Sequence, residues 1–233
     1  GGGWREERHG LVRGWQWRCV FSNGRASGKV AGRTALPQML AMMESARGDG
    51  VDVACDVYPY TAGSTQLIHV LPPECQSGGL EQLSKRLGDA AFRAQLRERM
   101  RTGEDFENIS LLVGWENIRI AALAGAEDQK YVGRSIAALA EAEGKDPFDA
   151  LFDLLAREHC AVTMIDEIAC EDDLEDILRD GHSSIISDSL YPGSGLCHPR
   201  VYGPFVRALE RYVRDLRPPP PEEAIEQLTG TTD

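Results

Sequence analysis

The order of helix and strand is clearest in residues 36–58, which read LPQMLAMMESARGDGVDVACDVY. Apolar side chains recur there at positions 36, 39, 40 and 43, the spacing of one helix face, and Pro37 suits a first turn. The Gly48-Asp49-Gly50 turn then leads into residues 51–58, an apolar run that predicts a buried strand. The stretch therefore predicts one helix–strand unit, with the helix running to about Arg47.

The same alternation continues along the chain. Helical spacing predicts further helices at 80–96, 147–155, 172–179, 203–214 and 222–228. Short apolar runs predict strands at 109–113, 118–123, 162–165 and 184–187. Asp146 and Pro147 have the residue types of an N-cap and a first helical position. This alternation indicates an α/β fold in which helices cover or close a parallel sheet.

The composition excludes several classes of protein. With 233 residues, 42% of them hydrophobic, the chain can form one large domain or two small ones. Its 25 Lys and Arg against 37 Asp and Glu give a formal charge of −12, so no nucleic-acid partner is expected. The apolar runs fall short of the roughly 20 residues of a bilayer span, so no membrane partner is expected either. Without a signal-peptide pattern in residues 1–18, we expect a cytoplasmic protein whose six scattered cysteines are core thiols.

Asp188 is the first candidate for a reactive group. It follows the strand predicted at 184–187, and in a parallel αβ barrel the residues after the strands converge on the active site. Aspartate is also a common turn residue, so a structural role in the loop is the alternative.

Three further candidates lie in the loop that contains Asp188 or at the end of the strand predicted at 51–58. Arg200 comes after a proline in a Gly-rich loop, where its planar guanidinium could bind a carboxylate through two hydrogen bonds. A solvated loop arginine is the alternative. Tyr58 and Tyr60 could line a pocket or simply pack against the turn that they belong to.

Several common sites are not supported. The sequence contains no G-x-G-x-x-G, Walker A or G-x-S-x-G pattern, which disfavours nucleotide binding and serine-hydrolase chemistry. Four histidines have no histidine or cysteine partner at metal-ligand spacing: His9, His69, His159 and His182.

Five motifs occur in an order that is typical of one enzyme family. They are DVYPYTAGST (56–65), VGRS (132–135), GKDPFDAL (144–151), SD (187–188) and HPRVYGPF (198–205). Over about residues 26–230, the chain resembles the D-aminoacylase, or N-acyl-D-amino-acid deacylase, family of metal-dependent amidohydrolases.

This resemblance implies an α/β fold that is part of a (β/α)8 TIM barrel. It also implies zinc-assisted hydrolysis of a small N-acyl-D-amino acid. The metal of such a site polarises the amide carbonyl and activates a water, and Asp188 matches the aspartate that binds the metal and takes the proton. Arg200 matches the arginine that holds the substrate carboxylate, and we expect His198, Tyr58 and Tyr60 to contribute to substrate binding.

The departures from the family lie near the start of the sequence. Where the family has S-H-x-K, the chain reads Ser22-Asn23-Gly24-Arg25, so Asn23 occupies the position of a histidine ligand. An amide oxygen is a poor zinc ligand. The family's H-x-H, Cys and T-H-x-R ligands would all lie upstream of this motif. We therefore expect an atypical N-terminal segment at 1–25 and the C-terminal part of an amidohydrolase barrel at 26–233.

Three functions follow from these observations. The first is a deacylase-like hydrolase acting on carbon–nitrogen bonds other than peptide bonds, with the chain as given incomplete, inactive and without bound zinc. The second is a non-catalytic pseudoenzyme or ligand-binding remnant of an amidohydrolase. The third is an amidohydrolase that acts on another cyclic amide.

Overall fold

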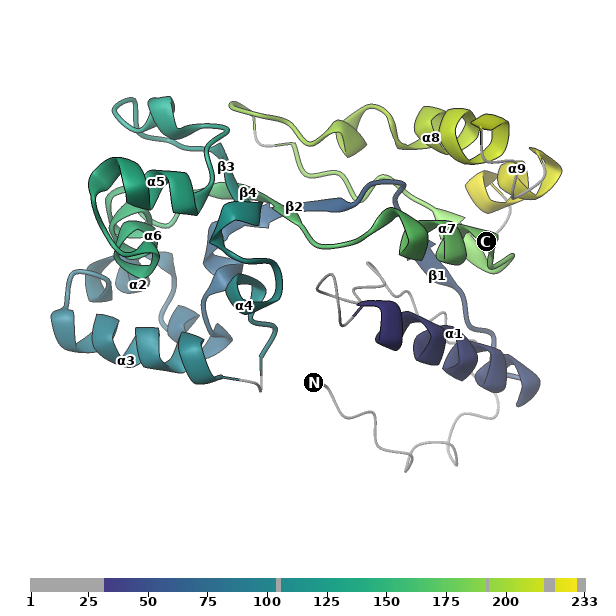
Figure 1. The fold of residues 1–233 in the computed structure, drawn as a ribbon, viewed down its shortest axis with the longest axis horizontal. Coiled ribbons are helices and arrows are strands. Elements are labelled where there is room, and N and C mark those ends of the chain that lie inside the picture. Colours follow the sequence, from purple (N-terminus) through teal and green to yellow (C-terminus); the bar gives the residue numbers. More distant parts are fainter. Residues whose placement is uncertain (1–31, 104–105, 192, 216–220, 230–233) are drawn as a thin grey trace. The chain divides into compact units, whose positions relative to one another are not determined.

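The computed structural model describes residues 32–103, 106–191, 193–215 and 221–229, and these residues fall into two compact units (Figure 1). Unit 1 consists of residues 62–167 and 190–198. Unit 2 contains the described parts of 3–61 and 199–233 together with 168–189. The domain boundary that we expect at residue 25 lies outside the described residues, as does Asn23.

Unit 1 is built on a three-stranded antiparallel sheet. Its strands, in the order β2-β4-β3, are β2 (Ala62–Gln66), β4 (Thr163–Glu167) and β3 (Ile118–Ala122). Strands near 118–123 and 162–165 are confirmed, but the expectation of a parallel sheet is wrong for this unit. Two helices, not one, connect β3 to β4, so the chain reverses direction once more than in a β-α-β crossover and β4 runs opposite to β3.

Five α-helices belong to unit 1: α2 (Leu80–Arg86), α3 (Ala90–Thr102), α4 (Ile109–Val113), α5 (Ile136–Glu143) and α6 (Pro147–Arg157). Short 3-10 turns lie between the strands and these helices: η2 (Leu67–Val70) and η3 (Pro73–Gln76) between β2 and α2, η4 (Trp115–Asn117) between α4 and β3, and η5 (Gln129–Tyr131) between β3 and α5. Asp146 caps α6 as predicted, because its side chain accepts a hydrogen bond of 2.9 Å from the Phe148 amide.

Two predictions for these helices are wrong. The single helix expected at 80–96 is interrupted, because the Asp89 side chain accepts a 2.7 Å hydrogen bond from the Phe92 amide and so begins α3 as a separate helix. The strand expected at 109–113 is the short helix α4, which buries Ile109 and Val113 four residues apart. A short apolar run does not distinguish a buried strand from a buried helical turn.

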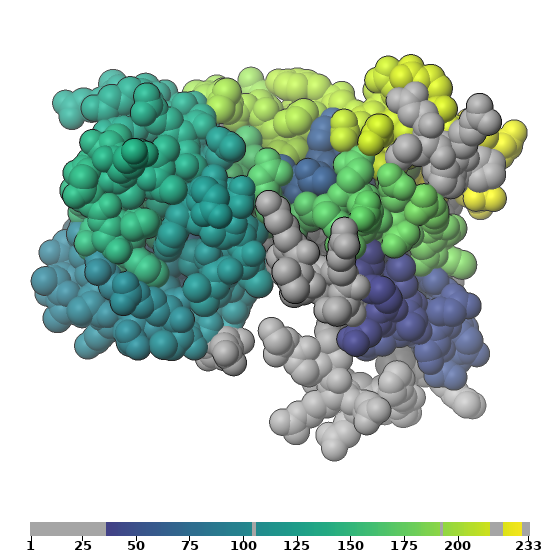
Figure 2. All heavy atoms as spheres, viewed as in Figure 1, coloured from purple at the N-terminus to yellow at the C-terminus, as the bar shows by residue number. Residues whose placement is uncertain are grey.

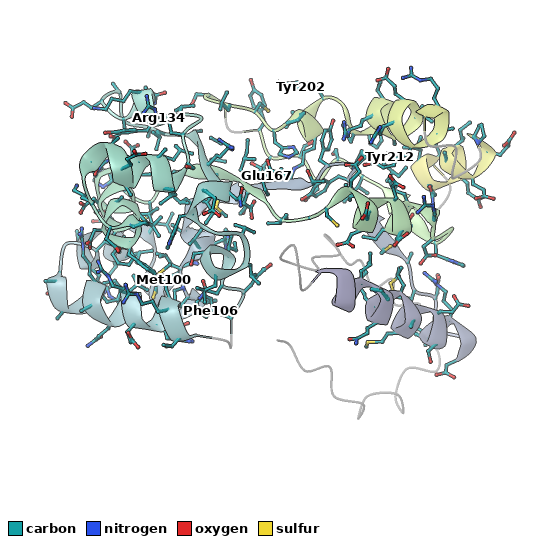
Figure 3. The ribbon with its side chains drawn as sticks, viewed as in Figure 1. Met100, Phe106, Arg134, Glu167, Tyr202 and Tyr212 are labelled. Carbon is teal, nitrogen blue, oxygen red and sulfur yellow. The ribbon has the colours of Figure 1, made fainter. Side chains whose placement is uncertain are left out.

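The core of unit 1 lies between its helices and the sheet. Figure 2 shows the atoms of residues 62–167, coloured from blue through teal to green, and Met100, labelled in Figure 3, is completely buried. The largest share of the core comes from α6, whose buried side chains are Phe148, Ala150, Leu151, Phe152, Leu154 and Leu155.

Unit 2 contains a parallel pair of short strands, β1 (Cys55–Val57) and β5 (Ser183–Ile185), with Cys55 opposite Ser183 and Val57 opposite Ile185. This pair confirms the parallel pairing that the sequence predicts, although both strands are shorter than expected. Its helices are α1 (Gly32–Gly48), α7 (Glu171–Arg179), α8 (Pro204–Arg207) with its π-helical continuation η7 (Ala208–Asp215), and α9 (Pro221–Thr229). The helices predicted near these positions are confirmed.

Polar contacts join the parts of unit 2 around an aliphatic core. Arg47 on α1 donates to the Val53 carbonyl at 2.9 Å and pairs with Asp180 at 3.2 Å. Gln227 on α9 is buried and its amide donates to Ser183 on β5 at 3.0 Å and to the Leu178 carbonyl at 3.0 Å. These contacts connect α1, α9 and β5 to the end of α7.

The described strands form two separate sheets, a mixed α/β arrangement, and within the described ranges they do not close into a barrel. No described helix is long and apolar enough to cross a membrane. The cysteines at 55, 75, 160, 170 and 197 are free thiols. Burial raises the pKa of the Cys55 thiol to about 12, as expected of a core cysteine.

Candidate functional site

An ion pair between Asp188 and Arg200 lies beyond the end of β5. Asp188 follows this strand by three residues, and Arg200 lies in the 3-10 turn η6 (Pro199–Val201). Asp188 Oδ2 is 3.1 Å from Arg200 Nη1, with the Arg200 side chain 3% exposed and the Asp188 side chain 37% exposed. The cation is therefore buried, and the carboxylate that faces it is the part open to solvent.

The backbone of Asp188 has an unusual conformation. Its φ of +43° lies in the left-handed region, which aspartate tolerates better than most residues but at a cost in energy. The Ser189 hydroxyl donates to the Arg200 carbonyl at 3.2 Å and so connects the Asp188 loop to the Arg200 turn. Strained backbone of this kind is concentrated at functional sites.

Tyr58, the residue after β1, lies beside the Asp188–Arg200 pair. Because β1 and β5 are parallel, the residues that follow them lie at one edge of the pair, and the Ile186 amide extends the pairing by donating to the Val57 carbonyl at 2.9 Å. The Arg200 guanidinium carbon is 4.7 Å from the centre of the buried Tyr58 ring. Such a cation–π contact orients the guanidinium as well as stabilising it.

Tyr60 lies two residues further along the same segment. Its hydroxyl donates to the Pro199 carbonyl at 3.4 Å, and the guanidinium carbon of Arg207 is 5.0 Å from its ring centre. Burial raises the pKa of the Tyr60 phenol, and the nearby Arg207 cation opposes this change. Tyr58, Tyr60, Asp188 and Arg200 are thus all brought together within unit 2.

His198 is the one predicted site residue that belongs to unit 1. It is buried, and its Nε2 lies 3.1 Å from the Ala62 carbonyl oxygen at the start of β2. Because a carbonyl only accepts, this contact requires Nε2 to carry the proton.

Arg207 is a residue near the site that the sequence analysis missed. Its guanidinium contacts both the Pro59 carbonyl and the Tyr60 ring, in addition to an acidic residue on α7. An arginine on a helix is usually solvated, and no local pattern distinguishes this one from Arg211 or Arg214 on the same helix.

The described residues do not fit a zinc site by themselves. Nowhere among them do three His, Cys, Asp or Glu side chains come together in a way that could hold a metal ion. Asp188, the predicted ligand, has an arginine cation against its carboxylate. Asn23, which the sequence motif predicts at the position of another ligand of the family, lies outside the described residues.

No family model matches the chain. The N-acyl-D-glutamate deacylase of Alcaligenes xylosoxydans xylosoxydans is 28% identical over 191 residues, which are 82% of this chain and 29% of that protein. The N-acyl-D-glutamate deacylase from Bordetella bronchiseptica, solved with zinc and a phosphonate mimic of the tetrahedral intermediate, is 27% identical with a TM-score of 0.59. The match covers 86% of this chain and 32% of that one. A D-aminoacylase with a binuclear metal centre is similar at 27% identity and a TM-score of 0.58, over 88% of this chain and 33% of that one.

Sequence and structure neighbours alike point to the N-acyl-D-amino-acid deacylase, or D-aminoacylase, group of amidohydrolases, as the sequence motifs predict. The chain spans about a third of the length of the relatives that it matches.

Proposed function

We propose that the chain carries the substrate-carboxylate site of a carbon–nitrogen hydrolase of the N-acyl-D-amino-acid deacylase type. The observation that carries this proposal is the pairing of Asp188 with the buried Arg200 at the end of a parallel strand pair. The activities of the similar proteins supply the substrate class, an N-acyl-D-amino acid.

Arg200 is the group that would bind the substrate's carboxylate. Its guanidinium rests on the Tyr58 ring at 4.7 Å, which holds the planar donor fork in one orientation. With its side chain only 3% exposed, a ligand carboxylate reaches it by taking the place of the Asp188 carboxylate. Substrate binding is therefore an exchange of one carboxylate for another on the same cation.

Asp188 would be set free by this exchange. Its carboxylate is 37% exposed while paired, and a carboxylate released beside a bound acyl amino acid can accept a proton from the water that attacks the amide. Tyr60 is the other proposed substrate contact of unit 2, and His198, which belongs to unit 1, stays a prediction from the sequence. We propose no step that passes through zinc for this chain, because the described residues do not fit the metal.

A second candidate function is binding without turnover, as in a pseudoenzyme. It is favoured because no three-ligand metal cluster occurs in the described parts of the chain. We propose this state for the chain as given: it binds the acyl amino acid and does not hydrolyse it. A cyclic-amide substrate is less well supported, since a ring amide does not by itself supply the carboxylate that Arg200 would bind.

Calorimetric titration with N-acetyl-D-glutamate, and with its neutral diamide as the control ligand, tests the proposal. We expect binding of the acid and none of the diamide. Arg200→Gln should abolish binding, and Arg200→Lys, which keeps the charge without the fork, should weaken it. Asp188→Asn should strengthen binding several-fold, because it removes the competing carboxylate. Arg134→Gln, an exposed arginine of unit 1 that is labelled in Figure 3, should change nothing.

Equal binding of acid and diamide would rule out the carboxylate site, and weaker binding by Asp188→Asn would rule out the exchange. Incubation with N-acetyl-D-glutamate and added zinc then separates the two functions. Zinc-dependent release of D-glutamate by the unmodified chain would establish a working hydrolase in place of a binding remnant.

A further inference from the structure

Arg207 connects three groups of unit 2 that are far apart in the sequence. Its Nε donates to the Pro59 carbonyl at 2.6 Å, and its guanidinium carbon lies 5.0 Å from the centre of the Tyr60 ring. Its Nη2 is 3.9 Å from Glu171 Oε1 at the start of α7. One side chain thus holds the segment that follows β1 against both α8 and α7.

The segment held in this way forms one wall of the proposed site. Tyr58, next to Pro59, lies against the Arg200 guanidinium. The Tyr60 hydroxyl donates to the carbonyl of Pro199, the residue before Arg200. A side-chain carbon at Gly203 would lie 2.9 Å from this hydroxyl, so the backbone after Arg200 approaches Tyr60 closely. A shift of Pro59 would therefore move groups on both sides of Arg200.

The far end of the Arg207 contact is itself fixed. Glu171 Oε1 accepts a 2.9 Å hydrogen bond from the hydroxyl of Tyr212, a buried side chain that is labelled in Figure 3. Arg211 Nε donates to the same oxygen at 3.3 Å. Because two other side chains hold Glu171 in place, loss of Arg207 alone leaves the junction between η7 and α7 connected.

We propose that Arg207 is a positioning residue for carboxylate recognition: it fixes the Tyr58–Tyr60 segment and, through Tyr58, the orientation of the Arg200 guanidinium. This inference rests on the proposed function of Arg200. It adds a determinant of substrate affinity that does not itself touch the substrate.

Arg211 provides a matched control for this proposal. Arg207 and Arg211 lie one turn apart, carry the same charge and share Glu171 as a partner. In the described structure, the contacts to Pro59 and Tyr60 come from Arg207, whereas the Arg211 guanidinium pairs with Glu171. Arg207→Gln and Arg211→Gln therefore remove the same charge from the same helix and differ in whether the segment is released.

The experiment compares these two variants in the full chain by amide hydrogen exchange and by titration with N-acetyl-D-glutamate. The Tyr60 amide, which donates to the Tyr58 carbonyl at 2.8 Å, should exchange about tenfold faster in Arg207→Gln and at the unchanged rate in Arg211→Gln. Affinity should fall about tenfold in Arg207→Gln alone, the typical net effect of one charge-assisted hydrogen bond. Arg207→Lys should recover part of the affinity.

Two outcomes would overturn the proposal: wild-type exchange and affinity in Arg207→Gln, or equal losses in both variants, which would indicate a general effect of the charge or of Glu171. If the unmodified chain binds no ligand, the proposed function fails, and the exchange rate of the Tyr60 amide still decides whether Arg207 holds the segment.

Discussion

The two units use their charged side chains differently. In unit 1, ion pairs join neighbouring helices or loops through partly exposed cations: Lys145, 38% exposed, pairs with Asp153 at 2.8 Å, and Arg157, 33% exposed, pairs with Asp128 at 2.6 Å. In unit 2, two pairs are placed beside the parallel strands, Arg47 with Asp180 and Arg200 with Asp188, and each contains a well-buried arginine.

This difference indicates which unit carries a binding site. The partly exposed cations of unit 1 remain in contact with water, so their ion pairs are expected to contribute little beyond local stability. A buried cation at the end of parallel strands is costly to desolvate, so its presence in unit 2 calls for a ligand or a structural partner. We therefore propose that unit 1 is a scaffold and that unit 2 contains the carboxylate site.

The largest loss of stability is expected in the core of unit 1. It tests whether unit 1 can be destabilised without unit 2. Phe152 is completely buried, with its ring 6.3 Å from that of Phe148. Phe152→Ala should destabilise unit 1 by about 3–5 kcal/mol, because it leaves a cavity among aliphatic side chains. Amide exchange should accelerate in β2, β3 and β4 and stay unchanged in β1 and β5. Equal acceleration in both sets of strands would show that the units unfold as one.

The next-largest loss of stability is expected at the buried Arg47–Asp180 pair of unit 2. Arg47→Ala leaves Asp180 without its cation and should cost about 3 kcal/mol, as is typical when one partner of a buried pair is removed. Both side chains are less than 15% exposed. Glu44→Ala is the control, because Glu44 contacts the same arginine from a side chain that is 77% exposed. The control should change stability by less than about 0.5 kcal/mol in denaturant unfolding. A loss from Glu44→Ala as large as that from Arg47→Ala would mean that burial of the ion pair does not decide its contribution.

The same aspartate gives unit 2 a dependence on pH. Burial alone would raise the pKa of the Asp180 carboxyl, but hydrogen bonds from the His182 amide and from Arg47 outweigh it and hold this pKa below its usual value. A lowered folded-state pKa stabilises the fold fully above the unfolded value of about 3.9, and this contribution disappears as the pH falls through the folded-state pKa. Unfolding followed from pH 6 downward should show the loss in unit 2, and Asp180→Asn should reduce it.

The smallest effect is expected at a helix cap of unit 1. Asp146→Ala removes the acceptor of the Phe148 amide at the start of α6 and should cost about 1 kcal/mol. Asp146→Asn should keep most of this stability, because asparagine caps as well as aspartate. Thermal unfolding of the two variants checks the prediction. A loss from asparagine as large as that from alanine would mean that the charge, and not the cap, matters.

Local chemistry explains which parts of the fold the sequence could predict. Helix α6 was predicted correctly because Asp146 and Pro147 begin it and its apolar spacing is regular. The run at 109–113 was not, since a five-residue segment with four apolar residues suits a strand or a helical turn equally. The antiparallel sheet depends on how many helices separate β3 from β4, which a strand's own residues do not encode.

In the candidate site too, local features could be predicted from the sequence and long-range contacts could not. The positions of Asp188 and Tyr58 could be predicted because each follows a strand, and parallel pairing brings such positions to one edge, whereas their roles stay predictions. Arg207 could not, because the groups that it contacts, Pro59 and Glu171, are distant in the sequence and approach it only through the fold.

The most direct test of the central claim, that unit 2 contains a carboxylate site, is a nuclear magnetic resonance titration of the full chain with N-acetyl-D-glutamate. We predict that the amide signals of Tyr58, Asp188 and Arg200 shift with a common dissociation constant, while those of β3 and α6 in unit 1 stay in place. The neutral diamide should produce none of these shifts. Shifts centred on unit 1, or equal shifts with the diamide, would contradict the account.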